Sequence, residues 1–558
     1  MNAGATQEPL EEGHAKDPRD LTAREIFIAI LASIAVAVAM SWPLATHLGD
    51  SVPYDLGDPL LTTWDTAWLG HAMKTNPTKI FQANIFNPEP DTTAYTDALY
   101  GLAPFSVIGN GRTAALVRHG IFWIGAYAVA LLGAFLLARE IGARWPAATV
   151  AALAFAYAPF RLGHGGHLHV LWSGGIPITF FLLVRGFRRR RWGLTIAGWI
   201  VAAWQLSLGW NIGLPFAYFL LAAAGITAIL VFARRLPSPG RIVVLATVAG
   251  AIFFAGFGFF LSRPYQRVVD AQPHARRPIG TVEYFSPPIS GLLAAPTESR
   301  VWGSIAKPYR AKLKAPVEES LFPGIVIVAL AGFGLFYGAW PRWVRFSLFG
   351  VAAVFTVLAL GVHSHGLGRW YPYRLLYNYA PGFQALRTPG RLTTFTALAL
   401  GLLGAMGVDV VTGRKKARVL FLAALVAAEG LGAPIPTARV PEAPRGIEQT
   451  GTALQLWLPI RLGQPSEALF MFWATDHFPP LVNGYSGLYP SRLANLSPYL
   501  EAFPDARSVQ AFRDYGIRTV VADRRLLFRT RWADVATRSI DGLSLSRRAA
   551  GDLVIFTL

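Results

Sequence analysis

Long runs of apolar residues recur along most of the chain and stop near residue 435. A helix that crosses a membrane needs roughly 20 predominantly apolar residues. The runs predict about eleven spanning helices, at residues 26–47, 113–138, 146–160, 170–184, 193–209, 213–233, 242–262, 321–339, 343–361, 391–411 and 419–435. The first run lacks the small-residue site at which a signal peptide is cleaved, so we expect it to remain as an anchor. The pattern therefore predicts an α-helical polytopic membrane protein, with residues 26–435 as its transmembrane domain.

Positive charge is concentrated in every second connection between these runs. The five connections are short, and Glu140 is the one acidic residue that we find in them. Their basic residues are Arg139, Arg144, Arg185, Arg188 to Arg191, Arg234, Arg235, Arg241, Arg342, Arg345, Arg414, Lys415, Lys416 and Arg418. Because lysine and arginine are retained in cytoplasmic loops, we expect these connections in the cytoplasm, together with residues 1–25. The remaining long connections are then extracytoplasmic, at residues 49–112, 160–169, 263–320 and 362–390.

Residues 436–558 follow the last apolar run and have a different pattern. Strand-like runs at 518–522 and 553–558 are accompanied by turn signals such as Pro479-Pro480 and Asn483-Gly484. We therefore expect a small α/β domain here, on the extracytoplasmic side.

Composition narrows the class of protein further. Hydrophobic residues make up 53% of the 558 residues and charged residues 15%, whereas about a quarter of the residues of soluble domains are charged. A formal net charge of +19 would suggest nucleic acid as the partner of a soluble protein. Here the basic residues lie between apolar runs, so we expect membrane lipids and phosphate-bearing lipids as partners, and no nucleic acid. The absence of cysteine excludes disulfides, thiolate metal sites and a cysteine nucleophile.

The connection at residues 49–112 carries the most informative acidic residues. Asp55 and Asp58 follow the first span by a few residues, at the boundary between water and lipid. Loss of solvation there should raise the pKa of a carboxyl group and make it a stronger base, which suits removal of a proton from an acceptor hydroxyl. Asp65 lies on the same face as Asp58 if the segment between them is helical. The alternative is that Asp55 and Asp58 only cap a helix.

Four phrases of the sequence suggest a family, namely LGDPLLTTW, ANIFNPEPDTTAYTDALYG, FQALRTPGRLTTF and PLVNGYSGLYP. Together with the early Asp in a long first outer loop, they resemble the GT-C superfamily of polyprenyl-phosphate-sugar glycosyltransferases, and more specifically a group of bacterial GT-C-type membrane proteins. The resemblance implies a bacterial inner membrane location, a polyprenyl-phosphate-linked sugar donor and a catalytic Asp in the first outer loop, here Asp58. GT-C enzymes often carry two acids one residue apart, whereas two residues separate Asp55 from Asp58. The base assignment and any divalent metal ion, such as Mg²⁺ or Mn²⁺, therefore stay open.

The connection at residues 160–169 combines Arg161 with His164, His167 and His169. Three imidazoles at this spacing suit a divalent metal. Alternatively Arg161 contacts the donor phosphate, and His164 and His167 contact the sugar or the acceptor. A third interpretation is a polar interfacial turn in which the histidines form local hydrogen bonds.

Basic residues are also frequent in the two later outer connections, against the topological bias. A bound anion explains this excess, because arginine binds phosphate oxygens bidentately. We therefore expect Arg263, Arg387 and Arg391 to bind the donor phosphate. The alternative is that these side chains reach the lipid headgroups and anchor the protein.

Further candidates for contact with the sugar or the acceptor lie in two outer segments. Asp97 belongs to the first outer loop, and His477 and Tyr485 belong to FWATDHFPPLVNGYSGLYP in the C-terminal domain. Glu429 lies within the last apolar run, where an acid is a functional candidate unless it pairs with a buried polar group.

These patterns favour a glycosyltransferase that moves a sugar from a polyprenyl-phosphate donor to a glycan, lipid or protein acceptor of the cell envelope. Asp58 would act as the base, with inversion at the anomeric carbon. Two other functions stay open: a flippase or other transporter of lipid-linked sugars, and a non-catalytic membrane scaffold with the same fold. The spans carry few charges and show no internal repeat, which disfavours the transporter.

Overall fold

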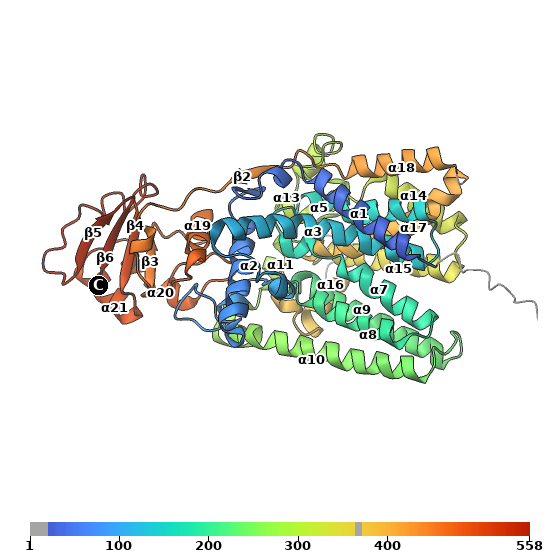
Figure 1. The fold of residues 1–558 in the computed structure, drawn as a ribbon, viewed down its shortest axis with the longest axis horizontal. Helices are drawn as coiled ribbons and strands as arrows, with labels where there is room; N and C mark the ends of the chain where they lie inside the picture. Colours follow the sequence, from blue (N-terminus) through green and yellow to red (C-terminus); the bar gives the residue numbers. More distant parts are fainter. Residues whose placement is uncertain (1–19, 363–370, 414) are drawn as a thin grey trace, which may run out of the picture.

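The computed structural model describes residues 20–362, 371–413 and 415–558. Within these residues a helix occupies each of the eleven predicted spans. These helices are α1 (Ala23–Met40), α3 (Gly111–Glu140), α4 (Trp145–Ala156), α7 (Gly175–Arg188), α8 (Trp192–Leu206), α9 (Trp210–Phe232), α10 (Arg241–Ala271), α14 (Ile325–Tyr337), α15 (Arg342–Ala359), α17 (Thr393–Thr412) and α18 (Lys416–Glu429). The predicted helical fold class is confirmed (Figure 1). Most of the predicted segment 1–25, residues 363–370 and Arg414 lie outside the described residues.

The helices differ in their capacity to cross a membrane. Among the described residues, seven helical segments are long and apolar enough to do so, whereas α4, α8 and α14 are shorter apolar helices. Several predicted spans are longer than their helices, including 26–47, 146–160, 321–339 and 419–435. In the last two cases α14 begins at Ile325 and α18 ends at Glu429. Pro323 precedes the first of these helices and Pro434 follows the second, and proline disfavours continuation of a helix.

Ion pairs join the basic connections at one end of the helix bundle. Glu140, at the end of α3, lies 2.6 Å from a nitrogen of Arg185 and 2.7 Å from one of Arg188, both near the end of α7. The neighbouring Arg139 pairs with Glu25 at the start of α1. Figure 1 shows the C-terminal domain at the opposite end of the molecule. Two of the five basic connections and the start of α1 therefore lie together at this end of the bundle, as the predicted grouping requires.

The first outer loop contains a further helix, α2 (Asp58–Thr75), which is largely buried. It packs against α3 and against α19 (Pro465–Trp473) of the C-terminal domain. Gly57 precedes the helix and Pro59 is in its first turn, where the missing N–H of proline costs no hydrogen bond. Asp58 is thus the first residue of α2, at the end where the backbone N–H groups are free.

The C-terminal domain contains a four-stranded sheet in the order β3–β4–β6–β5. Its strands are β3 (Gln455–Leu458), β4 (Thr519–Asp523), β5 (Ser546–Ala550) and β6 (Leu553–Thr557), and its helices include α19, α20 (Ser491–Leu500) and α21 (Ala506–Tyr515). β3 and β4 are parallel, and the other two pairs are antiparallel. The predicted strands at 518–522 and 553–558 are β4 and β6, so the predicted α/β domain is confirmed.

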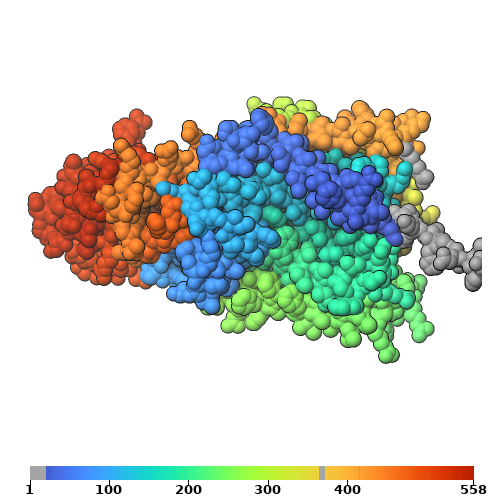
Figure 2. Space-filling model, viewed as in Figure 1, coloured from blue at the N-terminus to red at the C-terminus, as the bar shows by residue number. Residues whose placement is uncertain are grey.

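Backbone hydrogen bonds join this domain to the first outer loop. β1 (Ser51–Pro53) pairs antiparallel with β2 (Thr437–Arg439). Leu481 N donates to Asn84 O at 2.7 Å, and Phe86 N donates to Asn483 O at 3.2 Å. Figure 2 shows the orange and red C-terminal residues in contact with the blue outer loop. The segment around residue 485 is thereby held against the membrane domain.

Candidate functional site

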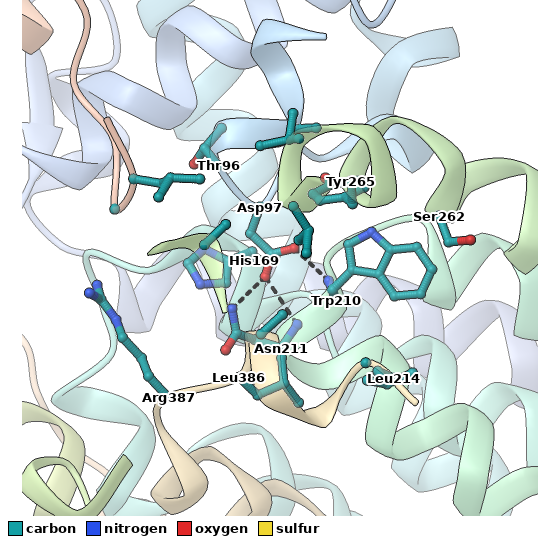
Figure 3. A pocket seen from close by; sticks show the side chains of 18 of the residues that line it. Thr96, Asp97, His169, Trp210, Asn211, Leu214, Ser262, Tyr265, Leu386 and Arg387 are labelled. Carbon is teal, nitrogen blue, oxygen red and sulfur yellow. Dashed lines mark hydrogen bonds between the residues drawn. The ribbon is translucent and has the colours of Figure 1, made fainter. Parts of the chain in front are cut away.

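A cavity of about 1100 Å³ lies where α2, α9 and α10 meet the loop before α17 and the segment around residue 485. Apolar side chains of α9 and α10, among them Leu214, Leu221, Phe254 and Phe259, line one part of it. The polar part includes Asp58, Asp97, His167, His169, Asn211, Arg276, Arg277, Glu318, Arg387, Arg391 and Tyr485. Figure 3 shows Asp97, His169, Asn211 and Arg387 around this part.

Asp58 lies in this cavity, with its Oδ2 3.1 Å from His167 Nε2. Burial would raise the pKa of the Asp58 carboxyl, but the hydrogen bond of His167 and the charges of His167, His169 and Arg391 lower this pKa to about 2. The expected rise in basicity is therefore wrong, because positive partners outweigh the loss of hydration. Asp58 is an ionised carboxylate at neutral pH.

The turn between α5 (Pro159–Leu162) and α6 (Leu168–Leu171) brings the predicted histidines to the site. His164 Nδ1 lies 3.2 Å from His167 Nδ1, and burial lowers the pKa of His164 to about 3. His169 Nε2 instead accepts a hydrogen bond of 2.9 Å from Arg391 Nη1. His164 and His167 are therefore in contact with each other, whereas His169 is hydrogen-bonded to Arg391.

A group of side chains at this place could hold a metal ion. His164, His167 and Glu318 each offer one ligand atom, and these atoms lie within 4.8 Å of one another. His164 Nε2 is buried and has no hydrogen-bond partner among the described residues, so this nitrogen is available as a ligand. Two imidazoles and one carboxylate suit Mn²⁺ or Zn²⁺, whereas Mg²⁺ prefers oxygen ligands. The donor set thus fits the expected Mn²⁺ better than the expected Mg²⁺.

Arg391 and Glu318 form a buried ion pair. Arg391 Nε donates to Glu318 Oε2 at 3.0 Å, and Arg391 Nη2 donates to Glu318 Oε1. Burial would raise the pKa of Glu318, but Arg391 holds it well below its usual range. Arg391 lines the cavity as predicted, yet its charge is already compensated. Nothing in the sequence pattern singled out Glu318.

Arg387 and Arg277 line the polar part of the cavity, and neither forms an ion pair among the described residues. The Arg387 guanidinium lies 5.3 Å from the centre of the Phe285 ring, and Arg277 Nη2 donates to Gly487 O at 2.6 Å. A Cβ added to Gly487 would lie 3.4 Å from Arg387 Nη2 and 3.7 Å from Arg277 Nη2. Burial, and then a neighbouring arginine, lowers the pKa of each guanidinium. Two cations without an ion-pair partner among the described residues therefore converge here, although the more distant charges of Glu318 and Asp58 raise the pKa of Arg387 in part. We predicted Arg387 and missed Arg277.

Asp97 lines the cavity, but its oxygens are occupied by the start of α9. They accept hydrogen bonds from the backbone N–H groups of Trp210 and Asn211 and from Asn211 Nδ2 at 2.7 Å (Figure 3). These groups would otherwise be unpaired at a helix N-terminus. Asp97 therefore positions α9, and its predicted contact with the sugar or the acceptor stays a prediction.

Tyr485 is brought to the site by the C-terminal domain. Burial raises the pKa of its hydroxyl, and so does the Asp58 carboxylate beside it. A Cβ added to Gly57 would lie 3.0 Å from Tyr485 Oη and 3.1 Å from Asp55 Oδ1. Asp55 Oδ1 also accepts a hydrogen bond of 2.7 Å from Gly57 N. The predicted residues Asp55, Asp58 and Tyr485 thus lie close together.

Four predicted ligand-binding residues do not line the cavity, and one of them is His164, which contacts His167 from behind the lining. Arg161 is fully buried and donates to Ser173 Oγ at 2.6 Å and to Leu171 O at 2.9 Å, so it supports the histidine turn. Arg263 is exposed on α10. His477 is exposed beyond the end of α19. Arg161 and Arg263 therefore lie outside the polar part of the cavity.

Two further acids have partners in the backbone. Asp65 is buried on α2 and accepts a hydrogen bond of 2.9 Å from Leu99 N. Glu429 accepts hydrogen bonds from Ile325 N at 2.8 Å and Val326 N at 3.0 Å. It therefore caps α14, which is the pairing alternative considered above for this acid.

A second cavity, of about 450 Å³, adjoins the first. Four residues line both cavities, namely Asp58, His167, Glu318 and Tyr485. The smaller cavity is also lined by Tyr54, Asp55, Gly163, Gly166, Phe285 and Glu298. Asp58 and His167 therefore lie between two spaces, each large enough for part of a substrate.

Solved structures with a similar fold include the cryo-EM structure of the arabinofuranosyltransferase AftD from Mycobacteria, with a TM-score of 0.57 and 15% identity over 96% of this chain and 40% of that chain. A mutant form of AftD gives a TM-score of 0.53 and 14% identity over 96% and 41%. The Archaeoglobus fulgidus oligosaccharyltransferase, in complex with Zn and sulfate, gives a TM-score of 0.48 and 13% identity over 93% and 70%. The chain spans about 40% of the length of AftD.

Neither a protein-family model nor a curated protein matches the sequence. The fold nevertheless defines the class of the molecule. It is a helical protein with apolar helices that can span a membrane, and its fold is similar to that of the arabinofuranosyltransferase AftD. This similarity of fold agrees with the resemblance to GT-C glycosyltransferases that the sequence suggested.

Proposed function

We propose that this chain transfers a sugar from a polyprenyl-phosphate donor to a cell-envelope acceptor, with inversion at the anomeric carbon. The observation that carries the proposal is the position of Asp58 between two cavities. An in-line displacement needs the attacking hydroxyl and the leaving phosphate on opposite sides of the anomeric carbon. Two adjoining spaces with the Asp58 carboxylate in the wall of both suit this arrangement.

The larger cavity suits the donor. Arg277 and Arg387 supply uncompensated positive charge for a phosphate, and arginine is well matched to phosphate oxygens. The apolar side chains of α9 and α10 in the same cavity suit the first units of a polyprenyl chain. The sugar would then lie toward Asp58, between the phosphate and the smaller cavity.

Asp58 would accept the proton of the acceptor hydroxyl. The hydroxyl oxygen forms a bond with the anomeric carbon, the bond from this carbon to the phosphate oxygen breaks, and the proton passes to the carboxylate. A strong base is not required, because the hydroxyl proton becomes acidic as its oxygen bonds to carbon. The ionised carboxylate also stabilises the positive charge that develops on the sugar ring. His167 would hold the carboxylate in place, and Arg277 and Arg387 would stabilise the departing phosphate.

We also propose His164, His167 and Glu318 as the residues that would hold a divalent metal, with Mn²⁺ favoured over Mg²⁺. When bound, the ion would supply positive charge to the site. Arg391 would keep Glu318 ionised and oriented.

The proposed location is a bacterial inner membrane, with the cavities and the C-terminal domain outside the cytoplasm. The grouping of the basic connections at the far end of the bundle supports this orientation, because such connections stay in the cytoplasm. A lipid-linked donor and an envelope acceptor would both be accessible from that side.

The test is sugar transfer by the purified protein in nanodiscs, from labelled polyprenyl-phosphate sugars to an envelope extract. Asp58→Asn should slow transfer by about 10²–10⁴-fold, the usual contribution of a positioned general base. Asp65→Asn is the matched control, because it makes the same substitution on the same helix at a carboxyl that contacts Leu99 N. Transfer by Asp58→Asn at the parent rate would remove the base from this residue. Absence of transfer by the parent from every donor would favour the scaffold or the transporter.

A further inference from the structure

One segment of the third outer connection, residues 289–314, exposes apolar side chains beside basic ones. The exposed apolar side chains are Ile289, Leu293, Val301, Ile305 and Tyr309. The exposed basic side chains are Arg300, Lys307, Lys312 and Lys314. The one acidic residue of the segment, Glu298, is only partly exposed. Aliphatic and cationic side chains are thus exposed together on one short segment.

The segment packs over a small core that is separate from the core of the helix bundle. Ala295, Ala306 and Phe322 are buried together in this small core. Arg310 joins two parts of the segment, because its Nη1 donates to Ala295 O at 2.7 Å and its Nη2 donates to Gly303 O at 2.9 Å. The exposed aliphatic side chains therefore lie outside the core that holds the segment together.

Hydrogen bonds attach the segment to the ends of two bundle helices. Trp302 Nε1 donates to Glu429 Oε1 at 3.2 Å, and Glu429 is the last residue of α18 and the cap of α14. Arg300 N donates to Leu431 O at 3.0 Å, just beyond the end of α18. In Figure 1 the yellow-green loops of this region lie at the end of α18 that faces the C-terminal domain. The segment therefore lies at the level where these helices end, away from the basic connections.

The three lysines of the segment lack the partners that would neutralise them. None of them forms a salt bridge with a described residue, although the Glu319 carboxylate attracts Lys314. Arg300 differs from the lysines, because its Nη2 donates to Pro434 O at 2.7 Å. The lysines are therefore the cations of this surface that are available to a partner.

A lipid surface matches both kinds of exposed side chain. Aliphatic side chains of an interfacial segment enter the boundary between headgroups and acyl chains. Lysine places its aliphatic stem along apolar surface and its ammonium group among the headgroups, and negatively charged lipids attract it. A water-soluble anionic polymer would match the lysines, but it would leave side chains such as Ile289 and Ile305 in water.

We propose that residues 289–314 form a binding surface for anionic phospholipids. The exposed aliphatic side chains enter the edge of the acyl layer, and the three lysines bind the negatively charged headgroups. This role is separate from sugar transfer, because it concerns the lipids around the protein rather than a substrate in the cavities. The segment continues into α13 (Pro316–Glu319), which carries Glu318 of the candidate site. Bound lipid would therefore hold the loop from which this acid comes.

The first experiment measures whether the segment contacts lipid. The chain has no cysteine, so Ile305→Cys, at a side chain that is 60% exposed, gives the full-length protein a single site for a nitrobenzoxadiazole label. Phosphatidylcholine with a nitroxide near the start of its acyl chain should quench this label in nanodiscs. Phe528→Cys is the control, because its side chain is 75% exposed in the C-terminal domain. We expect severalfold stronger quenching at Ile305 than at Phe528.

The second experiment measures the preference for a headgroup at the Ile305 label. Nitroxide-labelled phosphatidylglycerol and phosphatidylcholine are compared as minor components of otherwise identical nanodiscs. Phosphatidylglycerol should quench more strongly at the same mole fraction. Combined Lys307→Gln, Lys312→Gln and Lys314→Gln should reduce this preference by up to about fivefold for each lysine removed. High salt should reduce it as well, because it screens exposed charges.

A variant with the same change in net charge is the control for the lysines. Combined Arg507→Gln, Arg518→Gln and Arg529→Gln removes three positive charges from exposed positions of the C-terminal domain. This variant should keep the preference of the parent for phosphatidylglycerol. Thermal unfolding should be parent-like in both combined variants, because every replaced side chain is exposed.

Each contrary result would overturn part of the proposal. Equally weak quenching at Ile305 and Phe528 would place the segment in water and reject the lipid surface. A preference for phosphatidylglycerol that is absent, or that survives loss of the lysines, would reject the binding of anionic headgroups. An equal loss in the arginine variant would assign the preference to net charge. Neither experiment measures sugar transfer, so these outcomes are distinguishable from failure of the proposed function.

Discussion

Removal of the two uncompensated arginines of the larger cavity should weaken binding of a lipid phosphate without destabilising the fold. A hydrogen bond to a charged group contributes about 1.5–3 kcal/mol. Arg277→Gln and Arg387→Gln should therefore each raise the Kd for polyprenyl phosphate by about 10- to 150-fold. The double variant should lose at least as much binding free energy as the weaker-binding single variant. The two losses of binding free energy need not add, because both side chains would contact one anion. Stability should change little, because relief of burial and of repulsion between neighbouring cations offsets the lost hydrogen bond from Arg277 to Gly487 O and the lost attraction of Glu318 and Asp58 for Arg387.

The assay is binding of polyprenyl phosphate and of neutral polyprenol to the protein in nanodiscs. The parent should prefer the phosphate, and the double variant should lose this preference while it binds polyprenol as before, since the apolar walls are intact. Polyprenyl phosphate at 100 times its Kd should stabilise the folded parent by about 2.7 kcal/mol, and this stabilisation should raise its Tm. Arg263→Gln is the control, because it removes one arginine from an exposed position on α10.

Equal Kd values for polyprenyl phosphate in the parent and the double variant would refute the assignment of the phosphate to Arg277 and Arg387. An equal loss in Arg263→Gln would refute it as well, because the effect would then follow net charge rather than position.

Three further predictions concern other regions. Burial raises the pKa of Asp65 to about 7. Between the pKa of the unfolded chain and this value, the folded protein binds a proton that the unfolded chain has released. The free energy of unfolding should therefore fall by about 1.4 kcal/mol per pH unit as the pH rises toward 7. In thermal unfolding between pH 5 and 8, Asp65→Asn should reduce this slope, and an unchanged slope would contradict the explanation. Glu429→Ala removes the acceptor for the N–H groups of Ile325 and Val326 and should lower stability by roughly 2–4 kcal/mol, while parent-like unfolding would exclude the capping role. Alkaline phosphatase fused after Leu558 should be active, and an inactive phosphatase in an expressed fusion would reverse the proposed orientation.

The helices were predictable because a single physical requirement determines their pattern. A segment surrounded by lipid must be apolar along its whole length, so the sequence predicts where α9 or α10 lies without reference to any other segment. The end of α18 was less predictable. Apolar residues continue past Glu429, and that acid becomes a cap only because α14 presents two N–H groups to it.

The site was less predictable because its parts come together through packing. His167 lies beside Asp58, and Glu318 beside Arg391, yet no spacing in the sequence relates these residues. The prediction of a raised pKa for Asp58 was wrong for this reason. The loss of hydration can be inferred from its position near lipid in the sequence, but the positive partners that lower its pKa cannot. Arg277 was overlooked because it was one of many basic residues in a long loop, and its position opposite Gly487 depends on the docked C-terminal domain.

The ion pair of Arg391 and Glu318 gives Arg391 a different role from Arg387, although the sequence could not distinguish the two arginines. Arg387 and Arg391 are four residues apart and were both expected to bind phosphate. Arg391 donates to Glu318 and to His169, and both Arg391 and Glu318 are buried. Breaking a buried ion pair by removing one partner costs about 3–5 kcal/mol. Arg391 is therefore poorly placed to leave Glu318 for a phosphate, whereas Arg387 has no carboxylate to leave. It follows that Arg391→Gln should impair folding and the arrangement of the histidine turn, and Arg387→Gln should impair donor binding alone.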